Sequence, residues 1–320
     1  MDANPDLPPV EDEEAGVMGL LEVDPSPVEQ TPIEYKEKSY FPDQQRDGEG
    51  ETEETRGVRR MNTLGLRLGD HGTAWWLLRI QKYSSYTFTA FAALHITNVS
   101  IIPLATRSVL ESNRYLLLTR PYYQSALTEP LLVGIPLVAH VTSGIALRLW
   151  RRRQALQRYG AETRTDKRTI PWPQLSGTSA LGFALVPLAG FHVWTTRILP
   201  LYAHGDSSLI NLNYISHGFA LYPFVSFTGF TALVGVGVWH FVWGAAKWMG
   251  FEPSQVKSTE DQKDLVRKRR RYVINGVSAA LTTLWLAGGL GIVGKDGKMP
   301  GWVGKEFEEL YKYLPIIGRW

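Results

Sequence analysis

Five long apolar segments alternate with polar ones along this chain. They cover residues 83–104, 128–150, 176–200, 218–246 and 272–294. A helix needs about 20 apolar residues to cross the roughly 30 Å hydrocarbon core of a bilayer, and each segment is long enough. The fourth is the longest, so we expect it to tilt or to begin inside the interface. The pattern predicts an all-α membrane protein with five transmembrane helices.

The polar flanks divide the chain further. Residues 1–60 are acidic and rich in Pro, Gly and Glu, which predicts a disordered tail, because such a segment buries too little apolar surface to offset its ordering entropy. Residues 61–82 are expected to form an interfacial lead-in, 83–294 the transmembrane domain, and 295–320 a short C-terminal tail. The slightly negative mean hydropathy of the whole chain is an average over these unlike parts.

Lys and Arg are concentrated in two of the loops between the spans. Residues 151–171 carry seven of them, the block RKRRR occupies 267–271, and residues 198–216 carry none. By the positive-inside rule, both basic loops and the N-terminal tail are expected on the cytosolic side. Basic blocks also occur in nucleic-acid-binding proteins. Beside membrane spans they indicate topology and contacts with anionic lipid, so membrane lipids and no nucleic acid are the expected partners.

Cysteine is absent from the chain, and this narrows the possible chemistry. Disulfides, zinc–thiolate sites and thiol catalysis are excluded. The acidic N-terminal segment is the opposite of a mitochondrial presequence, which would be basic, amphipathic and poor in acids.

The first four spans contain an internal repeat built around histidine. HITNVSIIPL starts at His95 in the first span and HVWTTRILPL at His192 in the third, each with a proline eight residues after the histidine. HVTSGIALR starts at His140 in the second span and HFVWGAAKW at His240 in the fourth, and both read His-x-x-x-Gly-x-Ala. The fifth span contains no histidine. We therefore predict two copies of a two-helix hairpin, with one intramembrane histidine on each helix.

The depths of these histidines follow from the helical rise of 1.5 Å per residue. His95 and His192 lie about 12 Å before their prolines, near the non-cytosolic end. His140 and His240 lie about 10–12 Å before the basic residues that end their spans, near the cytosolic end. The repeat thus sorts the four into two layers of two. Two imidazoles can bind one iron from opposite sides, so the pattern predicts one or two haem b groups with these histidines as iron ligands.

Further residues around the histidines fit this prediction. Gly144 and Gly244 lie four residues after their histidines, on the same helical face, where they would leave room for a flat macrocycle. Arg148 and Arg197 lie where the haem propionates would point. The alternative for each histidine is a simple hydrogen bond between helices. The remaining histidines fall in loops or at an interface and are expected to be ordinary surface residues: His71, His204 and His217.

Small residues in the fifth span indicate close helix packing rather than chemistry. They form two groups, Gly276 with Ala280 and Gly288 with Gly291.

The HVTSGI stretch of the second span resembles the haem-ligand helix of succinate dehydrogenase and fumarate reductase cytochrome b anchors. In those anchors an Arg-His pair follows, and here Ala146 and Leu147 stand in its place. Their quinone-site signature is not evident in the first span. The resemblance therefore implies haem binding and does not extend to quinone chemistry.

The sequence as a whole resembles the fungal Mdm-ten-complementing family. Five spans, the duplicated histidine hairpin, the RRR after the second span and the acidic tail carry this resemblance. It implies an integral protein of the mitochondrial outer membrane that acts in lipid homeostasis. Members of that family recruit the bridge-like lipid-transfer protein vacuolar protein sorting thirteen through a Pro-x-Pro motif. Here the stretch LLEVDPSP supplies the matching residues Leu20, Val23, Pro25 and Pro27.

Two functions of different classes follow. The first is a receptor for a bridge-like lipid-transfer protein at membrane contact sites. The helix bundle would in addition scramble phospholipids between the leaflets, because a bridge delivers lipid to one leaflet only. The alternative is a di-haem b-type cytochrome that passes electrons across the membrane, for which no substrate site and no catalytic residue is evident. A secondary transporter would need broken helices with paired midplane charges, which the spans do not show clearly.

Overall fold

The computed structural model describes residues 72–256 and 260–314. The described residues belong to one compact unit. All regular elements in the described ranges are helices, which confirms the predicted all-α class. His71 and the predicted tail motif at Leu20–Pro27 lie outside the described residues.

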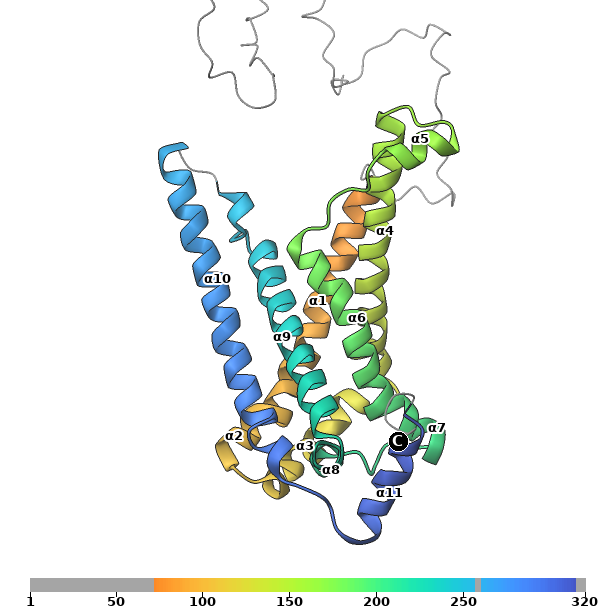
Figure 1. The fold of residues 1–320 in the computed structure, drawn as a ribbon, viewed down its shortest axis with the longest axis vertical. Helices are drawn as coiled ribbons and strands as arrows, with labels where there is room; N and C mark the ends of the chain where they lie inside the picture. Colours follow the sequence, from red (N-terminus) through yellow and green to blue (C-terminus); the bar gives the residue numbers. More distant parts are fainter. Residues whose placement is uncertain (1–71, 257–259, 315–320) are drawn as a thin grey trace, which may run out of the picture. The chain divides into compact units, whose positions relative to one another are not determined.

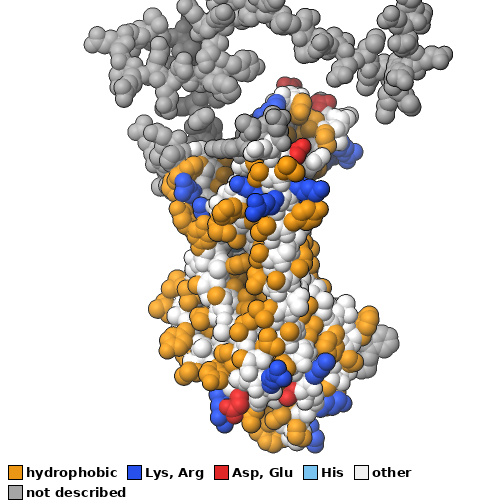
Figure 2. Space-filling view, turned by 90° about the vertical axis from the view of Figure 1, so that its left-hand side faces the viewer, with side chains coloured by type: hydrophobic (Ala, Val, Ile, Leu, Met, Phe, Trp, Pro, Cys, Tyr) orange, Lys and Arg blue, Asp and Glu red, His pale blue; other side chains and the backbone are white. Residues whose placement is uncertain are grey.

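Five helical segments are long and apolar enough to cross a membrane. They are Thr73–Thr106, Pro130–Arg158, Gly177–His204, Pro223–Gln255 and Gln262–Lys295. On the face shown in Figure 2, charged side chains gather at two levels, and the surface between them is apolar or uncharged. The expected five-span architecture is therefore confirmed.

The first hairpin pairs α1 (Thr73–Ile96) with α4 (Ile135–Arg158). The predicted interfacial lead-in is helical from Thr73 on and forms the first turns of α1. Between these two helices the chain forms shorter elements at the far end of the hairpin: the π-helical turn η2 (Thr97–Ile101), α2 (Ile102–Thr106), α3 (Val109–Gln124) and the π-helical turn η3 (Pro130–Gly134).

The second hairpin pairs α6 (Gly177–Val193) with α9 (Pro223–Trp248). The elements between them are the π-helical turn η4 (Trp194–Ile198), α7 (Leu199–His204) and α8 (Leu212–Leu221). The predicted fourth span began at residue 218 and is corrected here: α8 ends at Leu221, and a new helix starts at Pro223, where proline suits a helical first turn.

The two π-helical turns η2 and η4 occupy equivalent places in the repeat. Each starts two residues after its histidine and leads into a short helix with Pro103 or Pro200 in the first turn. Proline has no N–H for an α-helical bond, and a local π turn is one way to place it without breaking the span. The structure thus extends the sequence repeat to the backbone.

The two basic loops lie at the same end of the bundle. One contains the short helix α5 (Arg164–Thr169), and the other leads through η5 (Pro253–Gln255) to α10 (Glu260–Gly289). The block RKRRR at 267–271, predicted to lie in the loop, is part of α10 instead. In Figure 1, α5 and the start of α10 are both at the top, whereas α2, α3, α7 and α8 are at the bottom. The predicted grouping of the basic loops on one side agrees with this arrangement.

The apolar core lies at the end of the bundle opposite the basic loops. The chain that follows the fifth span folds back there. After η6 (Val293–Lys295), the helix α11 (Gly301–Lys312) packs on α8. Tyr214, Phe307 and Leu310 are at most 1% exposed, and the Tyr311 hydroxyl donates to the Tyr214 carbonyl. The segment predicted as a short C-terminal tail therefore contributes an amphipathic helix to the core.

The fifth span packs through one of its two groups of small residues. A Cβ built on Gly288 would lie 1.9 Å from the carbonyl oxygen of Ser100, so only glycine allows this approach. Gly276 has nothing within 4 Å of such a Cβ, and both Gly276 and Ala280 are exposed on the protein surface. The packing prediction is confirmed for Gly288 and wrong for Gly276 and Ala280.

Candidate functional site

The four intramembrane histidines form two pairs, and each pair takes one residue from each hairpin. His95 at the end of α1 faces His192 at the end of α6, with the ring centres 5.9 Å apart. His140 on α4 faces His240 on α9, with the ring centres 6.0 Å apart. The structure therefore brings together the residues that the sequence repeat pairs. We call them the distal layer (His95 and His192) and the proximal layer (His140 and His240), the latter lying nearer the basic loops.

In the proximal layer both imidazoles hydrogen-bond a backbone carbonyl through Nδ1. His140 Nδ1 lies 3.1 Å from the Gln81 oxygen on α1, and His240 Nδ1 lies 2.9 Å from the Thr178 oxygen on α6. A carbonyl only accepts, so Nδ1 of each neutral ring carries the proton and Nε2 keeps its lone pair. Gln81 and Thr178 are related by the same offset as His95 and His192, so these bonds belong to the repeat.

The distal layer has aromatic neighbours instead. His95 stacks on Phe91 with ring centres 5.5 Å apart, and His192 makes an edge contact with Phe230 at 5.7 Å. Among the residues described, neither ring has a hydrogen-bond partner. The Nδ1 atom of His192 is buried without such a partner. The two layers therefore differ in what holds their rings.

The spacing between the layers follows from the helices that carry them. Gln81, which contacts His140, precedes His95 by 14 residues on the first span, and Thr178 precedes His192 by the same number. At 1.5 Å per residue the layers lie about 21 Å apart along the helix axes. They are two separate sites stacked across the membrane.

Each pair has the separation expected for an iron bound between two imidazoles. A metal–nitrogen bond of about 2.0 Å on either side puts the two ring centres roughly 6 Å apart, which agrees with the separations of 5.9 and 6.0 Å. Two nitrogen ligands on opposite sides suit a metal whose other positions are filled by a macrocycle. In residues 72–256 and 260–314, no group of three or more His, Asp or Glu could hold a bare ion. The donor sets fit haem iron.

The two glycines expected to leave room for a macrocycle differ in their surroundings. A Cβ on Gly144 would lie 3.0 Å from the side-chain nitrogen Nε2 of Gln81 on α1, and one on Gly244 would have nothing within 4 Å. Gly182 was not singled out from the sequence, yet a Cβ there would lie 2.8 Å from Cε1 of His240. Gly182 is one helical turn after Thr178, so the ring rests on this glycine while its Nδ1–H reaches the Thr178 carbonyl.

Arg148, expected near a haem propionate, braces the first basic loop in this structure. It donates to the Pro173 carbonyl at 3.2 Å, and its guanidinium stands 5.5 Å from the centre of the Trp172 ring. The buried Arg152 stands 5.0 Å from the same ring. The two arginines fix Trp172 at the end of the span.

Arg197, the second expected propionate partner, forms an ion pair with Glu129 at the start of the second span. Their side chains are 22% and 30% exposed, and Arg197 also donates to the Ser207 hydroxyl. The roles of Arg148 and Arg197 toward a propionate stay predictions.

His217 was expected to be a surface residue, and this expectation is wrong. It is 1% exposed and packs against Phe307 of α11. Its Nδ1 accepts the Met299 N–H at 2.9 Å, and its Nε2 lies 3.5 Å from the Glu308 carboxylate. Burial lowers the pKa of His217 below its ordinary value. By contrast, His204 is exposed, as expected.

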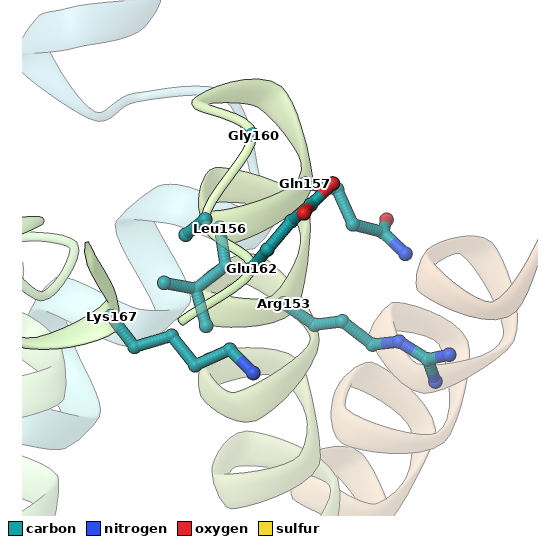
Figure 3. A pocket seen from close by; sticks show the side chains of 7 residues that line it. Arg153, Leu156, Gln157, Gly160, Glu162 and Lys167 are labelled. Carbon is teal, nitrogen blue, oxygen red and sulfur yellow. The ribbon is translucent and has the colours of Figure 1, made fainter. Parts of the chain in front are cut away.

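A shallow hollow of about 450 Å³ lies at the basic end of the bundle. Figure 3 shows the charged side chains of Arg153, Glu162 and Lys167 around it. Arg153 follows His140 by 13 residues, about 20 Å along the helix, so the hollow is separate from the histidine layers. It belongs to the surface expected to contact anionic lipid.

The fold and the site define a multi-pass membrane protein in which two histidine-bearing hairpins face each other. Residues 187–298, from the third span to the end of the fifth, match the family model described as MDM10-complementing protein 1, transmembrane domain. Over these residues the chain is similar to this family, in agreement with the resemblance of its sequence. No curated protein and no solved structure matches the chain. The resemblance to cytochrome b anchors stays a prediction.

Proposed function

We propose that this chain is a mitochondrial outer-membrane protein of lipid homeostasis whose transmembrane core holds two haem b groups, one in each histidine layer. The observation that supports haem binding is the pairing of four histidines across two hairpins, at ring separations of 5.9 and 6.0 Å. The membrane and the cellular process are suggested by the family match.

The residues have distinct roles in this proposal. His140 and His240 would bind one iron through Nε2, since their Nδ1 atoms face carbonyls. His95 and His192 would bind the other, with Phe91 and neighbouring rings excluding water. Bound haem supplies one-electron redox chemistry, and two such groups about 21 Å apart would connect the two sides of the membrane.

The optical spectrum of the purified full-length protein tests haem binding. We expect a strong Soret band and a split α-band, and a colourless protein would refute the proposal. His140→Ala and His240→Ala should each remove the same half of the haem, and His95→Ala and His192→Ala the other half. The double change within a pair should cost little more than either single one, because losing one axial ligand already disables the site. His204→Ala, at an exposed histidine, serves as the control.

A second role, as receptor for a bridge-like lipid-transfer protein, is supported by the tail sequence LLEVDPSP together with the family match. Proline has a fixed φ, so Pro25 and Pro27 would lose little freedom on binding. Leu20 and Val23 would fill adjacent apolar pockets. The 45 residues between Pro27 and Thr73 would span about 4 nm as a random coil, a reach that suits capture of a partner at an apposed membrane.

The receptor role is tested by changing Pro25 and Pro27 together to Ala. We expect recruitment of the lipid-transfer protein to be lost, with insertion, abundance and the haem spectrum unchanged. The matched control is Pro8 and Pro9 changed together to Ala, two prolines in the same tail outside the motif. Recruitment that survives the Pro25 and Pro27 change would place the receptor surface elsewhere.

A further inference from the structure

The two histidine layers are not equally prepared to bind a ligand. In the proximal layer both Nδ1 atoms are held by carbonyls, that of Gln81 and that of Thr178. In the distal layer, no ring nitrogen of His95 or His192 has a hydrogen-bond partner within the described part of the chain. The difference is notable because the two layers otherwise match in ring separation and in their place in the repeat.

This difference changes the free energy of binding iron at Nε2. In the proximal layer the carbonyl contacts select the Nδ1–H tautomer and restrict the ring orientation, so the Nε2 lone pair of each ring is available to a ligand. In the distal layer, coordination through Nε2 of His192 leaves a proton on its Nδ1, buried with no acceptor. A buried donor without a partner is unfavourable, and this cost opposes binding in the distal layer only.

We propose that the proximal layer is the high-affinity haem site, filled first and emptied last, and that the carbonyls of Gln81 and Thr178 set this order. This inference rests on the proposed haem-binding function. Partners that orient a metal-ligating histidine contribute about 10–100-fold in metal affinity, and we expect the two layers to differ by that factor. When haem is scarce, the protein holds one group near the basic loops and none in the distal layer.

Gly182 is the positioning residue through which the order can be altered. A Cβ at this position would lie 2.8 Å from Cε1 and 3.2 Å from Nδ1 of His240. Gly182→Ala would therefore push the ring away from the Thr178 carbonyl while leaving all four histidines present. Gly190 lies on the same helix, α6, and a Cβ there would meet nothing within 4 Å. Gly190→Ala is the matched control.

The test is a spectrophotometric titration with hemin of full-length protein purified in detergent from haem-deficient cells. Two phases are expected, and the tighter one should disappear in His240→Ala and persist in His192→Ala. Gly182→Ala should weaken the tight phase 10–100-fold, and Gly190→Ala should leave it unchanged. Circular dichroism confirms that each variant keeps its helices.

The outcomes separate the two proposals. Two phases of equal affinity, or a tight phase that is lost in His192→Ala and kept in His240→Ala, would overturn the inference while haem binding stands. A tight phase that is unchanged in Gly182→Ala would overturn the role of the Thr178 carbonyl contact. Protein that binds no hemin would overturn the proposed function as well.

Discussion

The carbonyl group of Ser100 fills the space that a side chain at Gly288 would need. A Cβ on Gly288 would lie 1.9 Å from the Ser100 oxygen, and the Ser100 hydroxyl donates to the Trp285 carbonyl at 2.7 Å. The π-helical turn η2 of the first span and α10 of the fifth are therefore in backbone contact. This contact attaches the fifth helix, which carries no histidine, to the helix that carries His95.

Gly288→Ala should therefore destabilise the protein, because the two backbones must separate to admit a methyl group. Overpacking of this kind costs about 1–3 kcal/mol, measured as the free energy of unfolding in detergent. Gly276→Ala on the same helix has no such contact. It should be neutral or stabilising by up to about 1 kcal/mol, because Ala has the higher helix propensity. Equal effects of the two changes would contradict the packing described.

The stability of the α11 region should depend on pH through His217. Burial is the largest effect and lowers the pKa of this imidazole, the nearby Glu308 raises it, and Lys298 lowers it. The folded state thus binds fewer protons than the unfolded state. The stabilisation is complete above the ordinary pKa of 6.5 and is lost as the pH falls from there toward the lowered folded value.

Amide hydrogen exchange measures this dependence locally. The protection of residues 301–312 should decrease between pH 7.5 and pH 5.5, because protonation of Nδ1 removes the acceptor of the Met299 N–H. In His217→Gln the protection should become insensitive to pH, and in His204→Gln, at an exposed site, the dependence should remain. Equal dependence in both variants would show that another group titrates.

The Arg197–Glu129 ion pair should matter more than ion pairs on the surface. Glu129→Gln leaves a partly buried guanidinium without its carboxylate, and hydrogen bonds to charged groups contribute about 1.5–3 kcal/mol. Glu111→Gln removes the exposed pair with Arg114, whose side chains are 45% and 71% exposed. This control should cost at most about 1 kcal/mol. Chemical unfolding of the two variants provides the comparison, and equal losses would contradict it.

The orientation of the chain is tested by protease treatment of intact organelles that carry the protein. Because the basic loops 151–171 and 247–271 are expected on the cytosolic side, a tag at the N-terminus should be removed. A tag after the C-terminal helix should be spared until the membrane is opened. The reverse pattern would invert the proximal and distal layers relative to the cytosol.

The sequence predicted the five spans and the pairs of histidines because both depend on order and spacing alone. Hydropathy defines a span without knowledge of its neighbours. A repeat fixes which residues share a depth, and this rule places His95 with His192. No such rule identifies a carbonyl acceptor, so the contacts of Gln81 and Thr178 have no signature in the sequence.

The burial of His217 could not be predicted from the residues near it in the sequence. Its burial depends on Met299 and Phe307, more than 80 residues later in the chain. The signal for α11 was present, since Phe307, Leu310 and Tyr311 have the i, i+3, i+4 spacing of an amphipathic helix. The charged residues between them conceal this pattern from a search for transmembrane segments.

The π-helical turns two residues after His95 and His192 show that the two hairpins match in backbone as well as in sequence. Each hairpin supplies one histidine to each layer. A single hairpin therefore holds two half-sites, and a layer is complete only when the second hairpin packs against the first. Separate chains covering residues 1–175 and 176–320 should accordingly still assemble and co-purify from one membrane.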